Sequence, residues 1–401
     1  MPRILVLGAG YAGVKAAQTV SGDPEHSLVW IDRNPYHLVV HEVHRHISSE
    51  SVENIIKIPV DEVKNVDLAE QARDTTNTAE YNPFAEEVPK KGRGVFLEAE
   101  VNSLDLMEKH VETSAGVLDY DYLIVAFGQR TSFQDIPGAM EHSVTCKSLE
   151  GALRIRESVR NDLEREGRTR VVVAGGGLTG IQAAGEIQRY CRSLGEDLDS
   201  FTVTVLEKRS RLLYDSDTEL RTEVERLLRR KGIVTHTNCT ATRVEDGAVK
   251  TEDGSYEFNV LVWAGGLTSR DVTNTSDIEE GPRPAIPVDP DLEVEGLSDC
   301  YVAGDAAFLG GKLPQTAWAA KQMGRCAAEN VLADASGEDT SALSIENPGT
   351  LVSVGKDALG MVNGKLVKGE TAKILKKGAA VRHIYDVAGT KRGFESSLTN
   401  L

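Results

Sequence analysis

The sequence predicts an α/β fold in which one strand–turn–helix–strand unit occurs twice. Each copy starts with a short apolar run and continues into a GxGxxG segment, first at Gly8–Gly13 and again at Gly175–Gly180. Further short apolar runs end at glycine-rich turns, which indicates additional strands for the two sheets. With 401 residues the chain is long enough for two or three domains that each bury a core.

The first copy has the order of elements that binding of a dinucleotide requires. Residues 3–7 are an apolar strand, residues 11–20 have helical spacing, and the apolar run at residues 28–31 ends at Asp32. The first glycine makes the tight turn, the second lets the backbone approach a pyrophosphate, and the third permits close helix packing. A carboxylate at the end of the second strand can accept hydrogen bonds from ribose hydroxyls. We therefore expect a Rossmann-type site at Gly8, Gly10, Gly13 and Asp32.

The same order returns in the second copy. A valine-rich strand at residues 170–174 precedes the glycines, a helix follows through Tyr190, and the strand at residues 201–206 ends at Glu207. Two such units predict two dinucleotides. A resident flavin must be reduced by a mobile donor, so FAD with a pyridine nucleotide is the simplest pair. The second site is expected at Gly175, Gly177, Gly180 and Glu207.

Later apolar runs predict how the two domains alternate along the chain. The runs at residues 121–126 and 260–264 would each end one nucleotide domain, and a third run at residues 301–303 leads into Gly304-Asp305. An acid there can accept hydrogen bonds from flavin ribityl hydroxyls, and a helix starting near Gln315 would direct its first amides at the flavin ring. We expect an FAD-binding domain of residues 1–145 and 285–335, an inserted NADH-binding domain of residues 146–284, and a C-terminal segment of residues 340–401.

Composition excludes several classes of protein. The chain has 62 acidic and 45 basic residues, a net charge of -17 that disfavours a nucleic-acid partner and suits a halophilic host. Its five cysteines form no CxxC pair, and the four histidines between residues 37 and 46 lack a cysteine or paired carboxylates beside them, so we expect no metal site. The sequence contains no long apolar span and does not begin like a signal peptide, which predicts a cytoplasmic protein.

Several motifs in this order make the chain resemble the type II NADH dehydrogenases, single-subunit, non-pumping NADH:quinone oxidoreductases that contain FAD. The resemblance extends over nearly the whole chain except about residues 67–92, which we interpret as a surface insertion. The motifs are Gly8-Ala9-Gly10-Tyr11-Ala12-Gly13, Asp32-Arg33-Asn34-Pro35-Tyr36-His37-Leu38, Ile136-Pro137-Gly138, Lys147-Ser148-Leu149-Glu150, Val262-Trp263-Ala264-Gly265-Gly266 and Gly304-Asp305.

The resemblance implies noncovalent FAD on the first unit, NADH on the second, hydride transfer to the flavin, and reduction of a membrane quinone from the other side. Carried over by position, FAD would be held by Gly8, Gly10, Gly13, Asp32 and Asp305, with Ala126 and Gly128 near it. NADH would be held by Gly175, Gly177, Gly180 and Glu207. Further cofactor-binding positions are Ala12, Arg33, Gly304, Ala317 and Gly265.

Two positions depart from the family pattern. Gln182 stands where the family usually has glutamate, and Trp318 stands where the Ala-Gln-x-Ala-x-Gln stretch has its first glutamine. The Gln182 amide cannot titrate but can orient a ligand by hydrogen bonds, and the Trp318 indole could lie along a quinone ring or fill the pocket. We assign Gln182, Trp318 and Gln322 to the catalytic site. A soluble NAD(P)H-dependent reductase with ferredoxin or rubredoxin as acceptor stays open as the alternative.

The C-terminal segment is basic although the protein is acidic. From Gly364 to Arg392 there are eight basic and two acidic residues. Apolar or small residues recur there at the spacing of one helical stripe, at Ile374, Gly378, Val381, Tyr385 and Ala388. A basic amphipathic helix predicts attachment to the inner face of the cell membrane. A helix that packs on the protein's own acidic surface, or that joins a homodimer, is the alternative.

Overall fold

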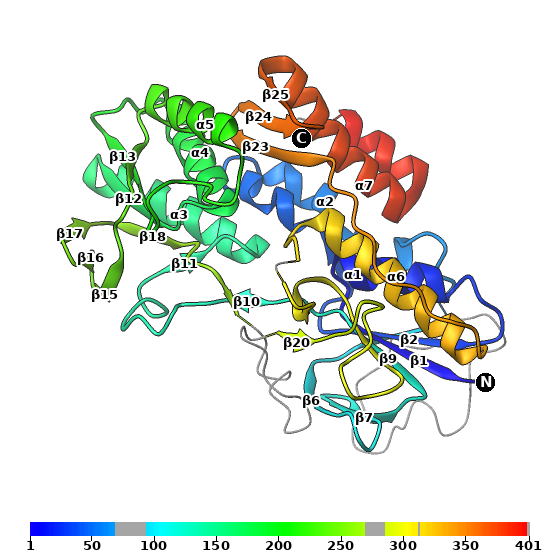
Figure 1. Ribbon diagram of the computed structural model, residues 1–401. Helices are drawn as coiled ribbons and strands as arrows, with labels where there is room; N and C mark the ends of the chain where they lie inside the picture. Colours follow the sequence, from blue (N-terminus) through cyan, green and yellow to red (C-terminus); the bar gives the residue numbers. More distant parts are fainter. Residues whose placement is uncertain (69–93, 269–284, 312, 399–401) are drawn as a thin grey trace.

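The computed structural model describes residues 1–68, 94–268, 285–311 and 313–398. The surface insertion expected at residues 67–92 lies almost wholly outside these ranges. As predicted, the chain is an α/β protein with two parallel sheets, which lie at the upper left and the lower right of Figure 1. We refer to the sheet that contains β1, with its helices, as the first unit, and to the sheet that contains β12 as the second unit.

Both sheets have five parallel strands. The order in the first sheet is β21 (Cys300–Val302), β9 (Tyr122–Val125), β1 (Arg3–Leu7), β2 (Ser27–Asp32) and β5 (Val95–Glu98). The order in the second sheet is β11 (Val144–Thr145), β18 (Val260–Trp263), β12 (Thr169–Ala174), β13 (Phe201–Leu206) and β14 (Val234–His236).

The remaining elements cover and connect these sheets. The helices are α1 (Tyr11–Val20), α2 (Glu53–Ile56), α3 (Leu149–Glu166), α4 (Leu178–Ser193), α5 (Thr218–Arg230) and α6 (Ala317–Ala335), with the 3-10 helix η1 (Val40–Ile47). Two three-stranded antiparallel sheets are β6 (Val101–Asp105), β7 (His110–Thr113) and β8 (Gly116–Asp119), and β15 (Ala241–Glu245), β16 (Ala248–Thr251) and β17 (Gly254–Glu257). Strand pairs are β3 (Tyr36–Leu38) with β4 (Lys57–Pro59), β10 (Arg130–Thr131) with β19 (Leu267–Thr268), and β20 (Ile286–Pro287) with β22 (Ala307–Phe308).

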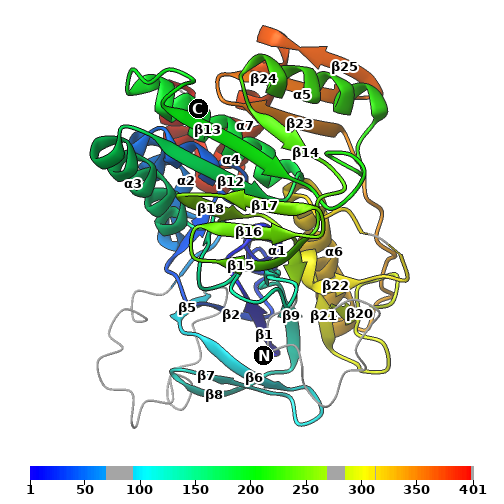
Figure 2. The same ribbon diagram turned by 90° about the vertical axis from the view of Figure 1, so that its left-hand side faces the viewer.

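The strands of the first sheet are continuous buried apolar runs because the sheet is covered on both faces. Residues 4–7 of β1 are fully buried, and so is Trp30 of β2. The Trp30 indole Nε1 donates a hydrogen bond of 2.9 Å to the Gly8 carbonyl, which fixes the turn after β1. Strand β21 is the edge strand beside β9, so a strand that follows the second unit in the sequence completes the sheet that contains β1 (Figure 2).

A third part, which we call the C-terminal module, consists of β23 (Gly349–Val354), β24 (Asp357–Val362), β25 (Lys365–Lys368) and α7 (Gly369–Leu398). Its sheet lies against α4 of the second unit, where Gly185 is so close that a Cβ atom would lie 2.5 Å from the Gly355 nitrogen. Its helix reaches the first unit, where the Lys64 nitrogen donates a hydrogen bond of 2.8 Å to the Val387 carbonyl. The module therefore bridges both units, as the views in Figures 1 and 2 also show.

Helix α7 differs from the simple amphipathic helix that the sequence predicts. It is interrupted at Gly389, which has a φ of 79°. Its inner face combines apolar residues such as Ile384 with buried polar side chains, among them Lys376 and His383. Of the predicted stripe, Ile374 and Tyr385 are 68% and 46% exposed. Ile374 therefore faces away from the protein, whereas the Tyr385 ring lies partly against the first unit, with the Lys64 ammonium 4.5 Å from its centre.

A pair of histidines joins α7 to the first unit. His37 Nδ1 lies 2.8 Å from the Ala9 carbonyl and so carries a proton, which leaves His37 Nε2 to accept from His383 Nε2 at 2.9 Å. Burial lowers the pKa of His37 to about 4 and holds the pKa of His383 well below its usual range. Both rings are neutral at pH 7.

We expect the folded state to lose stability as the pH falls from about 6.5 towards 4. The unfolded chain binds protons at these histidines in that range and the folded chain does not, which costs about 1.4 kcal/mol per pH unit for each histidine. His383→Gln keeps a donor for His37 and removes one titrating ring, so its unfolding free energy should depend less steeply on pH. Denaturant unfolding at a series of pH values measures this, with the exposed His142→Gln as the control. Equal slopes for His383→Gln and the parent would contradict the explanation.

Candidate dinucleotide sites and the buried polar cluster between them

The two glycine loops have the same geometry. In the first unit the Asp32 carboxylate accepts hydrogen bonds from the Ala9 nitrogen at 2.6 Å and the Asn34 nitrogen at 2.8 Å. In the second unit the Glu207 carboxylate accepts from the Gly176 nitrogen at 2.7 Å and the Arg209 nitrogen at 2.8 Å. Each acid thus holds the middle of its loop from the end of the neighbouring strand.

Both loops leave space where phosphate groups would lie. Among the described residues, neither α1 nor α4 has a side-chain cap, so the first amides of each helix remain available for an anion. A Cβ atom on Gly10 would come no closer than 3.8 Å to another group, and one on Gly177 or Gly128 would meet nothing within 4 Å. By contrast, a Cβ atom on Gly8 would lie 2.6 Å from the Ala126 carbonyl oxygen. These residues fit a dinucleotide in each loop.

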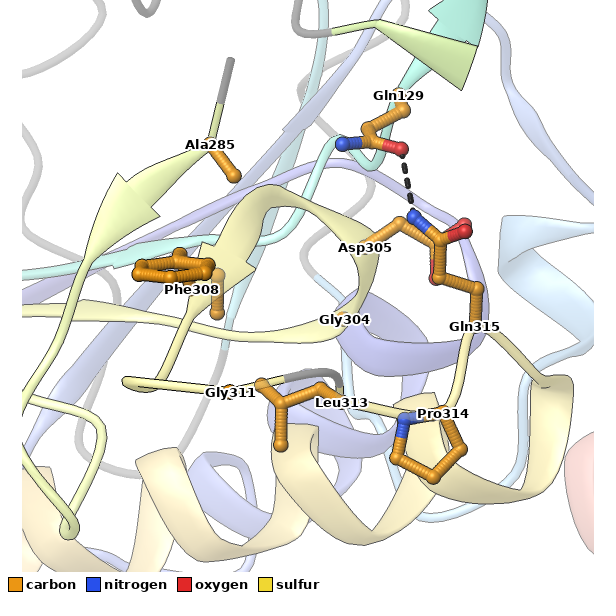
Figure 3. Close-up of a pocket in the computed structure, with 10 residues that line it drawn as sticks. Gln129, Ala285, Gly304, Asp305, Phe308, Gly311, Leu313, Pro314 and Gln315 are labelled. Carbon is orange, nitrogen blue, oxygen red and sulfur yellow. Dashed lines mark hydrogen bonds between the residues drawn. The ribbon is translucent and has the colours of Figure 1, made fainter. Parts of the chain in front are cut away.

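A pocket beside the first loop has Asp305 in its lining (Figure 3). Asp305 follows β21, and the same pocket wall includes Phe308, Leu313 and Gln315, whose Nε2 donates a hydrogen bond of 2.9 Å to Gln129 Oε1. Burial raises the pKa of the Asp305 carboxyl, and the nearby Lys147 ammonium opposes that rise. Lys147 was not among the predicted site residues, although it begins one of the quoted motifs.

Several predicted cofactor positions lie around this pocket and the first loop. Ala12 is packed against Gly304, where an added Cβ atom would be 3.3 Å from the Ala12 Cβ atom. Arg33 is half-exposed and lies 3.5 Å from Glu100. Helix α6 begins at Ala317, two residues beyond the predicted start, because Thr316 caps it by accepting from the Ala319 nitrogen at 3.1 Å. Gly265 lies away from this pocket, at the end of β18 in the second unit, against the indole of Trp263.

The three predicted catalytic residues do not form one cluster. The Lys321 ammonium lies 4.9 Å from the ring centre of Trp318, whose Nε1 is buried without a hydrogen-bond partner among the described residues. Gln322 Nε2 donates a hydrogen bond of 3.0 Å to the Glu346 carbonyl, and Gln322 Oε1 accepts one of 3.0 Å from the Glu346 nitrogen. These two bonds attach the segment before β23 to α6. Gln182 lies elsewhere, in the interior.

Gln182 belongs to a buried polar cluster at the junction of the two units and the C-terminal module. Its Oε1 accepts a hydrogen bond of 3.0 Å from Lys376 Nζ and lies 3.4 Å from the Ser353 nitrogen and hydroxyl. Lys376 Nζ is also 3.4 Å from Glu42 Oε1, and His44 Nε2 is 3.2 Å from the Ser353 hydroxyl. Glu42 and Lys376 are not among the residues predicted from the sequence, because both occur in charged stretches that are typical of solvated surface.

Comparisons with known proteins agree with this arrangement. Type II NADH:quinone oxidoreductases of Staphylococcus saprophyticus and Staphylococcus haemolyticus are each 27% identical to this chain, covering 98% of each protein. The fold is similar to the structure of NDH2 from Plasmodium falciparum in complex with NADH, with a TM-score of 0.82, 15% identity and coverage of 98% of this chain and 97% of that one. The sulfide:quinone oxidoreductase of Aquifex aeolicus has a TM-score of 0.78 at 16% identity, covering 96% and 91%.

The match to a family extends over a sequence pattern that is longer than any single motif. The pattern includes both glycine loops, both acids at the strand ends and the Gly-Asp turn after β21. The sequence model of the family described as pyridine nucleotide-disulphide oxidoreductase matches residues 2–324, most of the 401-residue chain. The chain therefore belongs to the pyridine nucleotide-disulphide oxidoreductase family.

Proposed function

We propose that this chain is an FAD-dependent type II NADH:quinone oxidoreductase. The observation that carries the proposal is the pair of matching loops, each with an uncapped helix start and an acid at the strand end. Relatives that are type II NADH:quinone oxidoreductases match 98% of the chain, including the C-terminal module. The purified protein should carry a flavin that NADH bleaches and that a soluble quinone reoxidises. A requirement for an added ferredoxin or rubredoxin would favour the soluble-reductase alternative.

The residues of the first unit would bind FAD, and those of the second unit would bind NADH. Gly8, Gly10, Gly13 and the first turn of α1 would hold the FAD pyrophosphate, Asp32 the ribose, and Asp305 the ribityl chain. When bound, FAD would supply the electron chemistry by accepting a hydride and passing two electrons on. Gly175, Gly177, Gly180 and Glu207 would orient NADH, so the protein contributes position and electrostatics.

Two buried cysteines, one in each unit, do not favour sulfide chemistry, in spite of the sulfide:quinone oxidoreductase among the structural neighbours. Cys146 and Cys300 are 3% and 2% exposed. Burial raises the pKa of the Cys146 thiol to about 12 and raises that of Cys300 as well. Such thiols are poor nucleophiles because the thiolate is the reactive form. A quinone acceptor with NADH as donor is therefore the better assignment.

We further propose that α7 attaches the protein to a membrane surface. Ile374, Leu375 and Tyr385 are exposed on a helix that also carries Arg382 on its outer side. Apolar side chains beside basic ones fit the boundary between acyl chains and anionic headgroups. None of the helices in the described ranges is both long enough and apolar enough to cross a bilayer. The exposed surface of α7 therefore supports attachment of the protein to one face of a membrane.

Glu207 should make the enzyme prefer NADH to NADPH, because a 2'-phosphate would meet its carboxylate. Glu207→Gln should reduce the ratio of kcat/KM values for NADH and NADPH about tenfold, the equivalent of about 1.4 kcal/mol. The exposed Glu219→Gln changes the net charge equally and should leave the ratio unchanged. A parent enzyme that prefers NADPH would refute the assignment of Glu207.

Substitution of Trp318 should change the rate at which quinone reoxidises the flavin more than the rate at which NADH reduces it. Trp318→Ala should let NADH bleach the flavin at the parent rate but slow its reoxidation by quinone about tenfold, while Trp318→Phe keeps an aromatic face and should retain most of the rate. Stopped-flow absorbance separates the two half-reactions. Equal losses in both would place Trp318 among the structural residues.

The exposed side of α7 should bind lipid. Ile374→Ser should weaken binding to vesicles of anionic phospholipid by roughly 2 kcal/mol, about 30-fold, as measured by sedimentation. Met107, which is 67% exposed in the β6–β7 turn at the far end of the molecule from α7, supplies the control Met107→Ser (Figure 1). Point changes are preferable to truncation because the inner face of α7 is buried. If neither substitution changes vesicle binding and the parent protein does not sediment with the vesicles, the alternative that α7 joins a homodimer gains support.

A further inference from the structure

A strained turn lies between β10 and β11, where the chain passes from the first unit to the second (Figure 1). Its central residues, Gln134 and Asp135, have φ values of 54° and 53°. The Ile136 nitrogen closes the turn with a hydrogen bond of 3.1 Å to the Phe133 carbonyl. Two successive positive φ values are typical of a type I′ turn, which usually has asparagine or glycine at these positions. Strain of this kind persists only where surrounding contacts hold it, and it is frequent at ligand clamps.

The second unit holds both ends of this turn. Before the turn, the Ser132 nitrogen donates a hydrogen bond of 3.1 Å to the Gly266 carbonyl. After the turn, the Val244 nitrogen donates one of 2.8 Å to the Pro137 carbonyl. Gly138 is packed so closely that an added Cβ atom would lie 2.0 Å from the Val244 carbonyl oxygen. Movement of the turn is therefore confined to its tip.

The Gln134 side chain at the tip joins the ends of two strands that are not neighbours. Its Nε2 donates a hydrogen bond to the Gly265 carbonyl, which follows β18. Its Oε1 accepts a hydrogen bond of 2.7 Å from Lys208 Nζ, which follows β13. In the sheet, β12 lies between β18 and β13, and the second glycine loop follows β12. The side chains of Gln134 and Lys208, which we call the strap, therefore pass across this loop.

The strap runs in the direction that a bound dinucleotide would take. In a doubly wound unit the dinucleotide lies across the carboxyl ends of the strands, with its pyrophosphate at the glycine loop of the central strand. Glu207, which would bind the ribose, lies at the end of β13 beside Lys208. A Cβ atom on Gly177 would meet nothing within 4 Å, so the strap leaves the phosphate position at the loop clear. A dinucleotide that enters from the open side of the loop has to displace the strap.

Lys208 carries the charge in the strap and can exchange its partner for a phosphate. Its side chain is exposed, and within the described ranges its ammonium pairs with no carboxylate and bonds to the Gln134 amide. The next residue differs, because Arg209 pairs with Asp215 at 3.3 Å and lies 4.6 Å from the ring centre of Tyr214. An ammonium forms a stronger hydrogen bond with a phosphate oxygen than with a neutral amide. The exchange is therefore favourable for Lys208 but not for Arg209.

We propose that Gln134 covers the NADH site before the nucleotide binds, and that Lys208 binds the pyrophosphate of NADH once the strap opens. This inference rests on the proposed function, because it takes the second loop as the NADH site. As NADH enters, Lys208 exchanges the Gln134 amide oxygen for a phosphate oxygen, and the Gln134 side chain moves off the loop. No covalent bond changes, and the ammonium keeps its protons. Lys208 is thus a binding residue, and Gln134 is a positioning residue that controls access.

The two members of the strap should have opposite effects on affinity. The probe is ADP-ribose, an unreactive fragment of NADH that contains the pyrophosphate. Gln134→Ala removes a bond that binding has to break, so it should lower the Kd for ADP-ribose about fivefold. Lys208→Met removes the phosphate partner and should raise the Kd about tenfold and make it depend less on salt. Titration calorimetry of the flavin-loaded, full-length protein measures both.

A double variant tests whether the two residues act together. When Lys208→Met is already present, Gln134→Ala should change the Kd by less than about twofold, because the amide has no ammonium to hold. Gln134→Asn keeps an amide and suits the positive φ, but its side chain is too short for both bonds, so its Kd should match that of Gln134→Ala. Lys250→Met removes the same charge from β16, where Lys250 lies 3.4 Å from Glu245, and should leave the Kd unchanged.

The outcomes separate the strap from the proposed function. If the parent protein binds no ADP-ribose and NADH does not bleach its flavin, the proposed function and the strap are both wrong. A parent that binds ADP-ribose but reduces no quinone refutes the proposed acceptor, and the affinities still decide on the strap. Weaker binding by Gln134→Ala would make Gln134 a direct ligand of the nucleotide, and an unchanged Kd for Lys208→Met would exclude its contact with the phosphates. Either result overturns the inference.

Discussion

The arrangement of this protein depends on one contact of backbone against backbone, which occurs once in each unit. The third glycine of each loop, Gly13 or Gly180, lies so close to the carbonyl of the first, Gly8 or Gly175, that any side chain would collide with it. This contact seats the helix directly above the end of its strand. The first amides of the helix then face the space beside the sheet, and the acid of the next strand can reach the loop. Both proposed nucleotide sites follow from that placement.

The local features could be predicted because they depend on residues close together in sequence. Glycine spacing determines the turn, and an apolar run followed by Asp32 or Glu207 determines a strand and its acid. The buried contact of Glu42 with Lys376 could not be predicted, since the two residues are more than 300 positions apart in the sequence. In the sequence Lys376 is one of the eight basic residues between Gly364 and Arg392, and nothing distinguishes it from Lys377. The cofactor and catalytic assignments carried over by position stay predictions.

The junction of the two units is stabilised by buried charges as well as by apolar contacts. Glu42, Arg45 and Glu186 lie in a region where an unpaired charge is costly, so each restricts the position of its partner. Apolar surfaces can slide past one another with little change in energy, whereas buried ion pairs and hydrogen bonds have one good register. The C-terminal module contributes Lys376 and His383 to this junction. It thereby fixes the relative position of the two units.

The place of β21 in the first sheet also has a consequence for synthesis on the ribosome. This strand pairs with β9 but leaves the ribosome only after the whole second unit has been made. The second unit is continuous from β11 to β18 and can bury its own core while the chain is still growing. The first sheet meanwhile has β9 as an unpaired edge, which can pair with another nascent chain. We therefore expect the second unit to fold first and the interval before β21 emerges to be the period when the chain most needs a chaperone.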